Sequence, residues 1–417
     1  MVFFFTKILI LEGVQMKKTF RCAFLLGLFI TLCGCSSACR TACQTQQKAA
    51  LPRCQKNIFL PSVIYAVPGV ESNIYFKNIF LAVNCDNYLF DVECKYGAQR
   101  LKRWCFTPAV KDGGKSFPLE IKVYDEEEKL VASAATTVVV APADAGKDKN
   151  ISILIIGDSL TAATAYPRKL HKHCSNPGNP RLTMIGAHAG RGKKAVAGEV
   201  AHEGYGGWKW NHFFSMYKDE KNMEPRKRIA AKSKFLTKKD GKVVFDFANY
   251  LNQYNKGKTP DFITIQLGVN DVFSATSATL EKRISTILAN ADKLIGYIRK
   301  DAPDVMIGIG YVTPGADQNA FAVNYKCSQT SWGYLRNSFR LNQAMEKHFA
   351  GRKNICMIPV NVNLDTENNF PAKEVQINGN LKITQQNNGV HPSYWGYNQM
   401  GDSYFAWLKN QLAAADK

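Results

Sequence analysis

A serine follows directly on an unbroken apolar run, at a point where it could act as a nucleophile. The run ISILII ends at Ile156 and continues into Gly157, Asp158, Ser159 and Leu160. A serine hydroxyl is a weak nucleophile by itself and needs a base that is oriented by a further group. It also needs hydrogen-bond donors for the oxyanion that forms during attack. Without such partners, Ser159 is simply a polar residue that ends a buried strand.

Two later segments carry groups that could stabilise an oxyanion. The sequence EGYGGW spans residues 203–208, and its glycines expose backbone N–H groups and allow a ligand to approach closely. The sequence FITIQL (262–267) is typical of a buried strand and is followed by GVND (268–271). The side-chain amide of Asn270 could donate a hydrogen bond, although Gly-x-Asn-Asp is also ordinary turn chemistry.

The candidate base lies near the end of the chain, in the sequence NNGVHP (387–392). Among the seven histidines, His391 is the one that precedes a proline and follows turn residues, which indicates an ordered loop. A single His-Pro pair is usually structural. The four signals together, in this order along the chain, are more specific.

Together these blocks resemble the SGNH hydrolases, also called GDSL esterases and lipases, over about residues 151–412. The resemblance implies a flavodoxin-like sheet with Ser159 as the nucleophile, whose backbone N–H helps to line the oxyanion hole. It assigns further oxyanion donors to the N–H of Gly207, with Gly206 as the alternative, and to the side chain of Asn270. His391 is then the general base, and no cofactor or metal is implied.

One position departs from the family pattern. The family usually has an aspartate three residues before the histidine, and this chain has Asn388 there. An asparagine oxygen can accept a hydrogen bond from imidazole but carries no charge to stabilise imidazolium. Three arrangements remain open: Ser-His-Asn, a Ser-His pair oriented by a backbone carbonyl, or an acid from elsewhere such as Asp365 or Glu203. A degenerate copy without catalytic activity is the fourth possibility.

The elements that must position these residues follow two patterns. Residues 151–417 alternate apolar strands such as VMIGIGY (305–311) with helical apolar stripes over 280–298 and 397–412, which predicts an α/β domain with a mainly parallel sheet. In such sheets, ligands bind beyond the carboxyl ends of the strands. Residues 55–142 instead predict a small all-β sandwich, and residues 143–150 a linker. The expected strands of the sandwich are Asn73–Val83, Pro118–Tyr124 and Leu130–Val140.

The N-terminus predicts export. Residues 1–34 read as a signal peptide of the lipoprotein type that starts at Met1 or Met16, and Leu32-Cys33-Gly34-Cys35 resembles a bacterial lipobox. Cys35 would then carry the lipid, with residues 35–54 as a tether; the alternative is a cleaved secretory signal. Both place the protein outside the cytoplasm, the first as a lipid-anchored protein of the bacterial cell envelope, where disulfides are allowed.

The charge balance bears on the substrate. Lys and Arg number 54 against 34 Asp and Glu, a net charge of +20, with a basic segment from Lys218 to Lys242. This balance favours acidic partners, and no zinc-finger or RNA-binding signature points to nucleic acid.

The sequence therefore predicts a serine esterase that removes acyl groups, above all O-acetyl groups, from an acetylated and acidic polysaccharide. The alternatives are a lipase or thioesterase of the same fold and a non-catalytic surface glycan-binding lipoprotein. The aromatic residues that could stack on sugar rings, or could equally be packing residues, are Trp208, Trp210, Trp332 and Tyr334.

Overall fold

The structure is a computed structural model. It describes residues 56–190, 193–196, 198–218, 223 and 230–415 of the 417. The predicted signal peptide, the tether and Cys35 lie outside the described residues, as does part of the basic segment after Lys218.

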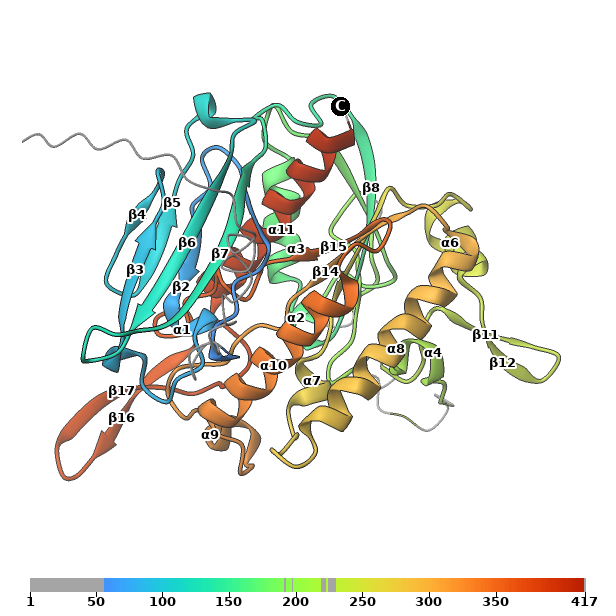
Figure 1. Cartoon of the computed structure of the whole chain (residues 1–417). Coiled ribbons are helices and arrows are strands. Elements are labelled where there is room, and N and C mark those ends of the chain that lie inside the picture. The colour runs from blue at the N-terminus through green and yellow to red at the C-terminus, as the bar shows by residue number, and fades with distance from the viewer. Residues whose placement is uncertain (1–55, 191–192, 197, 219–222, 224–229, 416–417) are drawn as a thin grey trace, which may run out of the picture. The chain divides into compact units, whose positions relative to one another are not determined.

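A parallel sheet forms the centre of the α/β part (Figure 1). Its strands are β8 (Asn150–Gly157), β9 (Arg181–Ile185), β10 (Glu203–Gly204), β13 (Phe262–Gln266), β14 (Met306–Gly310) and β15 (Ile355–Ile358). All pairings are parallel, and β9 and β10 share one edge of β8. The spatial order β9-β8-β13-β14-β15 is the 2-1-3-4-5 winding of a flavodoxin-like sheet, which confirms the predicted fold class of this part. The predicted strands at 151–156, 262–267 and 305–311 are also confirmed.

Helices cover both faces of this sheet. The longer ones are α3 (Ala165–Cys174), α6 (Phe247–Asn255), α8 (Leu280–Asp301), α10 (Ser331–Phe349) and α11 (Tyr394–Ala415). Right-handed crossovers put α3 and the returning α11 on one face and α8 and α10 on the other, consistent with Figure 1. The predicted apolar stripes are buried: Leu294 and Ile298 of α8 and Tyr404 and Trp407 of α11 are 0% exposed.

Short elements occupy the connections. They are α2 (Ser159–Ala162), α4 (His212–Ser215), α7 (Val269–Val272), α9 (Phe321–Tyr325), and the hairpins β11 (Leu236–Lys239)–β12 (Lys242–Phe245) and β16 (Ala372–Ile377)–β17 (Leu381–Gln386). Three of the short helices, α2, α7 and α9, carry residues of the candidate site. The β16–β17 hairpin leads directly into the loop that carries His391.

The β-rich part consists of two sheets with a shared apolar core. One sheet has the order β1-β7-β6-β3 and the other the order β2-β5-β4. The strands are β1 (Val63–Ala66), β2 (Ser72–Tyr75), β3 (Leu89–Glu93), β4 (Ala98–Gln99), β5 (Arg103–Phe106), β6 (Ser116–Tyr124) and β7 (Leu130–Val140). Ile74 and Trp104 of the second sheet pack in one cluster with Leu119 and Val138 of the first. The division into domains at residues 142 and 150 remains a prediction.

The expected strand Asn73–Val83 was wrong beyond Tyr75. Strand β2 ends there, and α1 (Phe76–Ile79) follows it. Asn78 explains the change, because its side-chain amide donates to the carbonyls of Asn361 and Leu364 at 2.9 and 2.8 Å. These long-range hydrogen bonds override the local preference of β-branched and aromatic residues for extended backbone.

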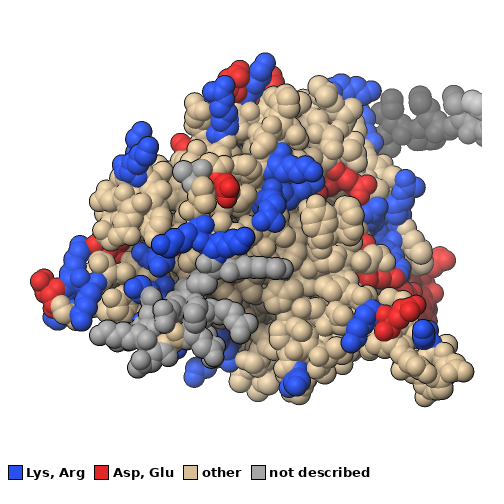
Figure 2. Space-filling model, turned by 180° about the vertical axis from the view of Figure 1, so that it is seen from behind, with Lys and Arg blue, Asp and Glu red and all other residues tan. Residues whose placement is uncertain are grey.

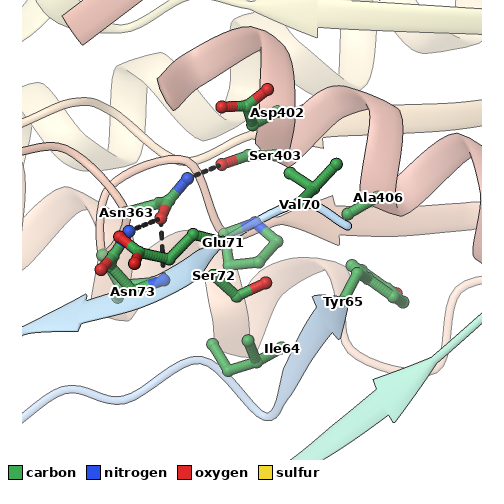
Figure 3. A pocket seen from close by; sticks show the side chains of 12 residues that line it. Ile64, Tyr65, Val70, Glu71, Ser72, Asn73, Asn363, Asp402, Ser403 and Ala406 are labelled. Atoms are coloured by element: carbon green, nitrogen blue, oxygen red, sulfur yellow. Dashed lines mark hydrogen bonds between the residues drawn. The ribbon is translucent and has the colours of Figure 1, made fainter. Parts of the chain in front are cut away.

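The segment after β15 joins the β-rich part to the α/β part (Figure 3). The side-chain oxygen of Asn363 accepts from the backbone and side-chain N–H groups of Asn73 at 2.8 and 3.0 Å. Its amide donates to the Gln399 carbonyl and the Ser403 hydroxyl of α11 at 3.0 and 3.1 Å. The cavity beside these groups measures about 10 Å³, room for about one water molecule. The two parts are therefore packed directly against each other.

The surface bears many basic side chains, which spread over much of the face in Figure 2. In the basic segment, Lys239 pairs with Asp246 at 2.7 Å, so part of its charge is compensated. The described cysteines are all unpaired: Cys85, Cys94, Cys105, Cys174, Cys327 and Cys356. Among the described helices, none has the length and apolar character to cross a membrane.

Candidate active site

Ser159 lies at the carboxyl end of β8, where the sequence predicted it. Strand β8 is buried over Ile153–Gly157 and ends at Gly157, and Ser159 is the first residue of α2. The turn is fixed by Asp158, whose carboxylate accepts from the backbone N–H of Leu160 at 2.9 Å. Ser159 itself is half-buried, whereas Asp158 and Leu160 on either side of it are 0% exposed.

His391 meets Ser159 directly. Its Nε2 lies 2.8 Å from the Ser159 hydroxyl oxygen, across 232 residues of sequence. This is the distance at which a base accepts a serine proton. Burial alone lowers the pKa of His391 below its usual 6.5, which keeps the imidazole neutral and able to accept that proton at neutral pH.

The glycine block lies beside the serine turn. Strand β10 pairs with the end of β8, with Gly204 opposite Gly157, and the Tyr205 N–H donates to the Gly157 carbonyl at 3.0 Å. Gly207 is exposed and has a φ of +76°, a conformation that favours glycine. Neither the N–H of Gly207 nor that of Ser159 has a hydrogen-bond acceptor among the described residues. Both are free to bind an incoming oxygen.

Asn270 joins the glycine block to the serine turn. It lies in α7, just beyond the carboxyl end of β13, and its side-chain amide donates to the Trp208 carbonyl at 2.9 Å. The same nitrogen makes a long contact of 3.4 Å to Asp158. Gly268 begins this turn with a φ of +123°, and a Cβ there would lie 2.5 Å from Val312. The turn that presents Asn270 therefore requires glycine.

Asn388 lies in the site but does not contact the imidazole of His391. Its side-chain oxygen accepts from the backbone N–H groups of Val390 and His391 at 3.0 and 2.9 Å. The imidazole Nδ1 instead lies 2.8 Å from the hydroxyl of Tyr325, which donates to the same Asn388 oxygen at 3.1 Å. Sequence reasoning missed Tyr325, which belongs to none of the four blocks.

Neither of the acids suggested from sequence reaches His391. Asp365 accepts from the backbone N–H groups of Glu367 and Asn368 at 3.0 and 2.9 Å. Glu203 is fully buried and accepts from the hydroxyls of Tyr205 and Tyr250. Burial raises the pKa of Glu203 to about 7. Both carboxyl groups are therefore hydrogen bonded to groups other than His391.

Of the four aromatic residues suggested by sequence, three are buried and Trp332 is exposed. Trp208, Trp210 and Tyr334 are 2%, 0% and 0% exposed, so they are packing residues, whereas Trp332 is 36% exposed. Tyr394 and Trp395 are 64% and 66% exposed and come directly after the His391 loop, at the start of α11. Only Ser393 separates Tyr394 and Trp395 from His391-Pro392 in the sequence. This closeness to the candidate base was the signal that could have identified them as candidate sugar-binding residues.

Comparisons with known proteins give structural neighbours only. No family model matches the chain, and no curated protein sequence matches it. Among solved structures, the chain is similar to a carbohydrate esterase family 3 from Talaromyces cellulolyticus, with 14% identity over 63% of this chain and 98% of that one and a TM-score of 0.38. It is similar to a Clostridium thermocellum family 3 carbohydrate esterase, with 16% identity over 64% and 100% and a TM-score of 0.37. An acetyl xylan esterase from the rumen bacterium Butyrivibrio proteoclasticus matches 87% of this chain and 95% of its own, with 13% identity and a TM-score of 0.33.

The fold follows from the chain's own geometry. The sheet has the 2-1-3-4-5 order, and Ser159, the glycine block (through Gly204 and Trp208), Asn270 and His391 come from four separate segments that meet beyond the carboxyl ends of β8 and β13. The α/β part of the described chain, from β8 to α11, therefore has the fold of an SGNH hydrolase.

Proposed function

We propose that this protein is a serine esterase that hydrolyses acyl esters, above all O-acetyl esters, on carbohydrate. The observation that carries the proposal is the 2.8 Å contact between the Ser159 hydroxyl and Nε2 of His391. The Asn270 amide contacts Asp158, the residue before Ser159, at 3.4 Å, and the N–H groups of Ser159 and Gly207 have no acceptor among the described residues, which supports their assignment as oxyanion donors. A nucleophile, a base and oxyanion donors are the groups that acyl transfer needs.

In the proposed reaction, the Ser159 oxygen attacks the ester carbonyl while Nε2 of His391 takes the serine proton. The oxyanion accepts from the N–H groups of Ser159 and Gly207 and from the Asn270 amide hydrogen that makes only the long contact to Asp158. Collapse breaks the bond to the sugar oxygen, which leaves with the proton from His391. Water then attacks the acyl-serine, gives its proton to His391, and releases the carboxylic acid and free Ser159.

The exposed pair Tyr394–Trp395 favours a carbohydrate as the alcohol half of the ester. Contiguous exposed apolar side chains can mark a ligand-binding surface, and these two neighbouring side chains are 64% and 66% exposed. The two rings lie 5.2 Å apart at an angle of 73°, so they offer two differently oriented faces to sugar rings. Trp395→Ala should raise KM for acetylated xylan several-fold and leave p-nitrophenyl acetate hydrolysis within twofold, because that substrate has no sugar to stack.

A basic groove beside the site favours an acidic glycan. Lys209, Lys282 and Arg283 line a groove of about 420 Å³. Two residues of its lining, Lys209 and Asp271, directly follow Trp208 and Asn270 in the sequence. The Asn270 amide donates to the Trp208 carbonyl at 2.9 Å, so the groove adjoins the site. None of the three cations forms an ion pair with a described carboxylate. Arg283 donates to the Asp271 carbonyl at 3.3 Å, so Lys209 and Lys282 are the cations available to the carboxylate of an acidic sugar.

The groove can be tested with one charge removal. Lys282→Gln should reduce the deacetylation of acidic xylan-derived oligosaccharides several-fold more than that of neutral ones, and added salt should reduce this difference. Lys258→Gln, which removes an exposed charge outside the groove, is the matched control. Equal effects of the two variants would exclude the groove as an anionic subsite.

The esterase proposal is tested by acetate release from p-nitrophenyl acetate and acetylated xylan. Wild type should release acetate from both, and Ser159→Ala should lose at least 10³-fold in turnover. Equal rates of the two proteins would reject Ser159 as the nucleophile and favour the glycan-binding alternative. A preference for long acyl chains would favour the lipase or thioesterase alternative.

Export and lipid anchoring through Cys35 are further proposals, supported by the N-terminal sequence alone. Cys35→Ser should move the protein from the membrane fraction of the producing bacterium to the soluble fraction. A wild-type protein already in the soluble fraction would instead favour the cleaved secretory signal, and a Cys35→Ser protein that stays in the membrane fraction would reject Cys35 as the anchor.

A further inference from the structure

The hydroxyl of Tyr325 stands between two groups of the site. Its oxygen is 2.8 Å from Nδ1 of His391 and 3.1 Å from the side-chain oxygen of Asn388. On the other side of the imidazole, Nε2 is 2.8 Å from the hydroxyl of Ser159. The four side chains thus form one continuous chain of hydrogen bonds from the nucleophile to Asn388.

The direction of the hydrogens in this chain follows from Asn388. Two backbone N–H groups, those of Val390 and His391, point at one side-chain atom of Asn388, so that atom must be the amide oxygen. An oxygen can only accept, and the Tyr325 hydroxyl must therefore donate its single hydrogen to Asn388. The hydroxyl oxygen is left as an acceptor for His391, and Nδ1 of His391 must carry the hydrogen between them.

This direction determines the tautomer of His391. With the hydrogen on Nδ1, Nε2 has a free lone pair and can accept the Ser159 proton. We propose that Tyr325 is the positioning residue of this site and that it acts through Asn388 in place of the acid that orients histidine in a Ser-His-Asp triad. The inference rests on the proposed function, because it assigns the group that holds the general base.

The surroundings hold Tyr325 in this position. It is the last residue of α9, and Lys326 ends the helix with a φ of +49°. The ring of Tyr325 packs edge-on against Phe273, with centroids 5.4 Å apart. Phe273 directly follows α7, the helix that carries Asn270. Among the described residues, no carboxylate and no backbone carbonyl is hydrogen bonded to Nδ1 of His391, so Tyr325 has no competitor for this nitrogen.

The activity test removes one oxygen atom. Tyr325→Phe should lower kcat for p-nitrophenyl acetate about 10- to 100-fold with KM within twofold, because imidazolium loses a hydrogen-bond acceptor in the transition state. The acidic limb of its pH–rate profile should move to lower pH, since the protonated form of His391 loses the same acceptor. Tyr124→Phe, a change at the end of β6 in the β-rich part, is the matched control and should equal wild type.

Asn388 supplies a second, conservative test. Asn388→Asp keeps the accepting oxygen and adds charge, so it should retain activity and move the acidic limb to higher pH. In the Tyr325→Phe background the same change should restore little activity, because the Asn388 oxygen reaches the ring only through the hydroxyl. Full rescue in that background, or a Tyr325→Phe protein within twofold of wild type, would overturn the inference.

A direct measurement separates this inference from the proposed function. Nitrogen NMR of protein labelled with ¹⁵N-histidine reports which ring nitrogen carries the hydrogen, and His391→Gln identifies the signals of His391. Wild type should have the hydrogen on Nδ1, and Tyr325→Phe should shift it toward Nε2. An unchanged tautomer in Tyr325→Phe would overturn the inference even in an active enzyme. The expected shift in a protein without esterase activity would support the relay and reject the proposed function.

Discussion

The buried carboxyl group of Asp158 predicts an unusual dependence of stability on pH. Asp158 is 0% exposed, and burial raises its pKa from 3.8 to about 7, helped by the charge of nearby Asp271. The folded protein therefore holds a proton on Asp158 over a pH range in which the unfolded chain has lost it. The stabilisation is fully present below pH 3.8 and is lost as the pH rises to about 7.

The size of the effect follows from the two pKa values. A difference of about three pKa units corresponds to about 4 kcal/mol over the whole range. Between pH 5 and pH 8 the same linkage relation gives a loss of about 2–3 kcal/mol for this one group. Burial also raises the pKa values of Asp271 and Glu203 to about 7. Both carboxyl groups therefore add to the loss of stability as the pH rises.

Asp158→Asn isolates the contribution of Asp158, because asparagine can still accept from the Leu160 N–H but cannot ionise. Urea unfolding at pH 5 and pH 8 should give a decrease in the free energy of unfolding that is about 2–3 kcal/mol smaller for the variant than for wild type. Any change in the free energy of unfolding that the substitution causes equally at both pH values cancels in this comparison. Asp304→Asn removes an exposed carboxylate that pairs with Lys353 at the surface and should leave the decrease unchanged. Equal decreases in wild type and Asp158→Asn would refute the burial reasoning.

Three further predictions concern single residues. Asn270→Ala should lower kcat about 10²- to 10³-fold through loss of an oxyanion donor, with an unchanged circular dichroism spectrum as the check that the fold is intact. Gly207→Ala should cost about 1–2 kcal/mol in urea unfolding, because φ is +76° and the added Cβ meets no atom within 4 Å; a larger loss would mean that the loop has rearranged. Asn363→Ala leaves the N–H groups of Asn73 without an acceptor and should lower the free energy of unfolding by about 2–4 kcal/mol. A loss under 1 kcal/mol would mean that this junction is not needed for stability.

Much of the fold could be predicted because the buried positions of a strand or helix are apolar and recur at a regular spacing along the chain. The apolar run 151–156 and the stripe from Tyr397 to Leu412 are local patterns, and the structure buries both. The order of the four blocks, together with strand–helix alternation, predicted that they meet at one edge of a parallel sheet. The strand expected to continue to Val83 failed because partners almost 300 residues away, at Asn361 and Leu364, set the backbone of Asn78.

By itself, the sequence determined the α/β class, the strand that delivers Ser159, and the identities of the nucleophile, base and oxyanion donors as candidates. It also revealed that position 388 lacks a charge. Only the tertiary structure decided what the Asn388 oxygen bonds to, because a hydrogen-bond partner depends on positions and directions in space. Tyr325 lies 66 residues before His391, and no spacing rule connects them. The folding of α9 against Phe273 brings the Tyr325 hydroxyl to Nδ1, and that contact determines which nitrogen of His391 faces Ser159 with a free lone pair.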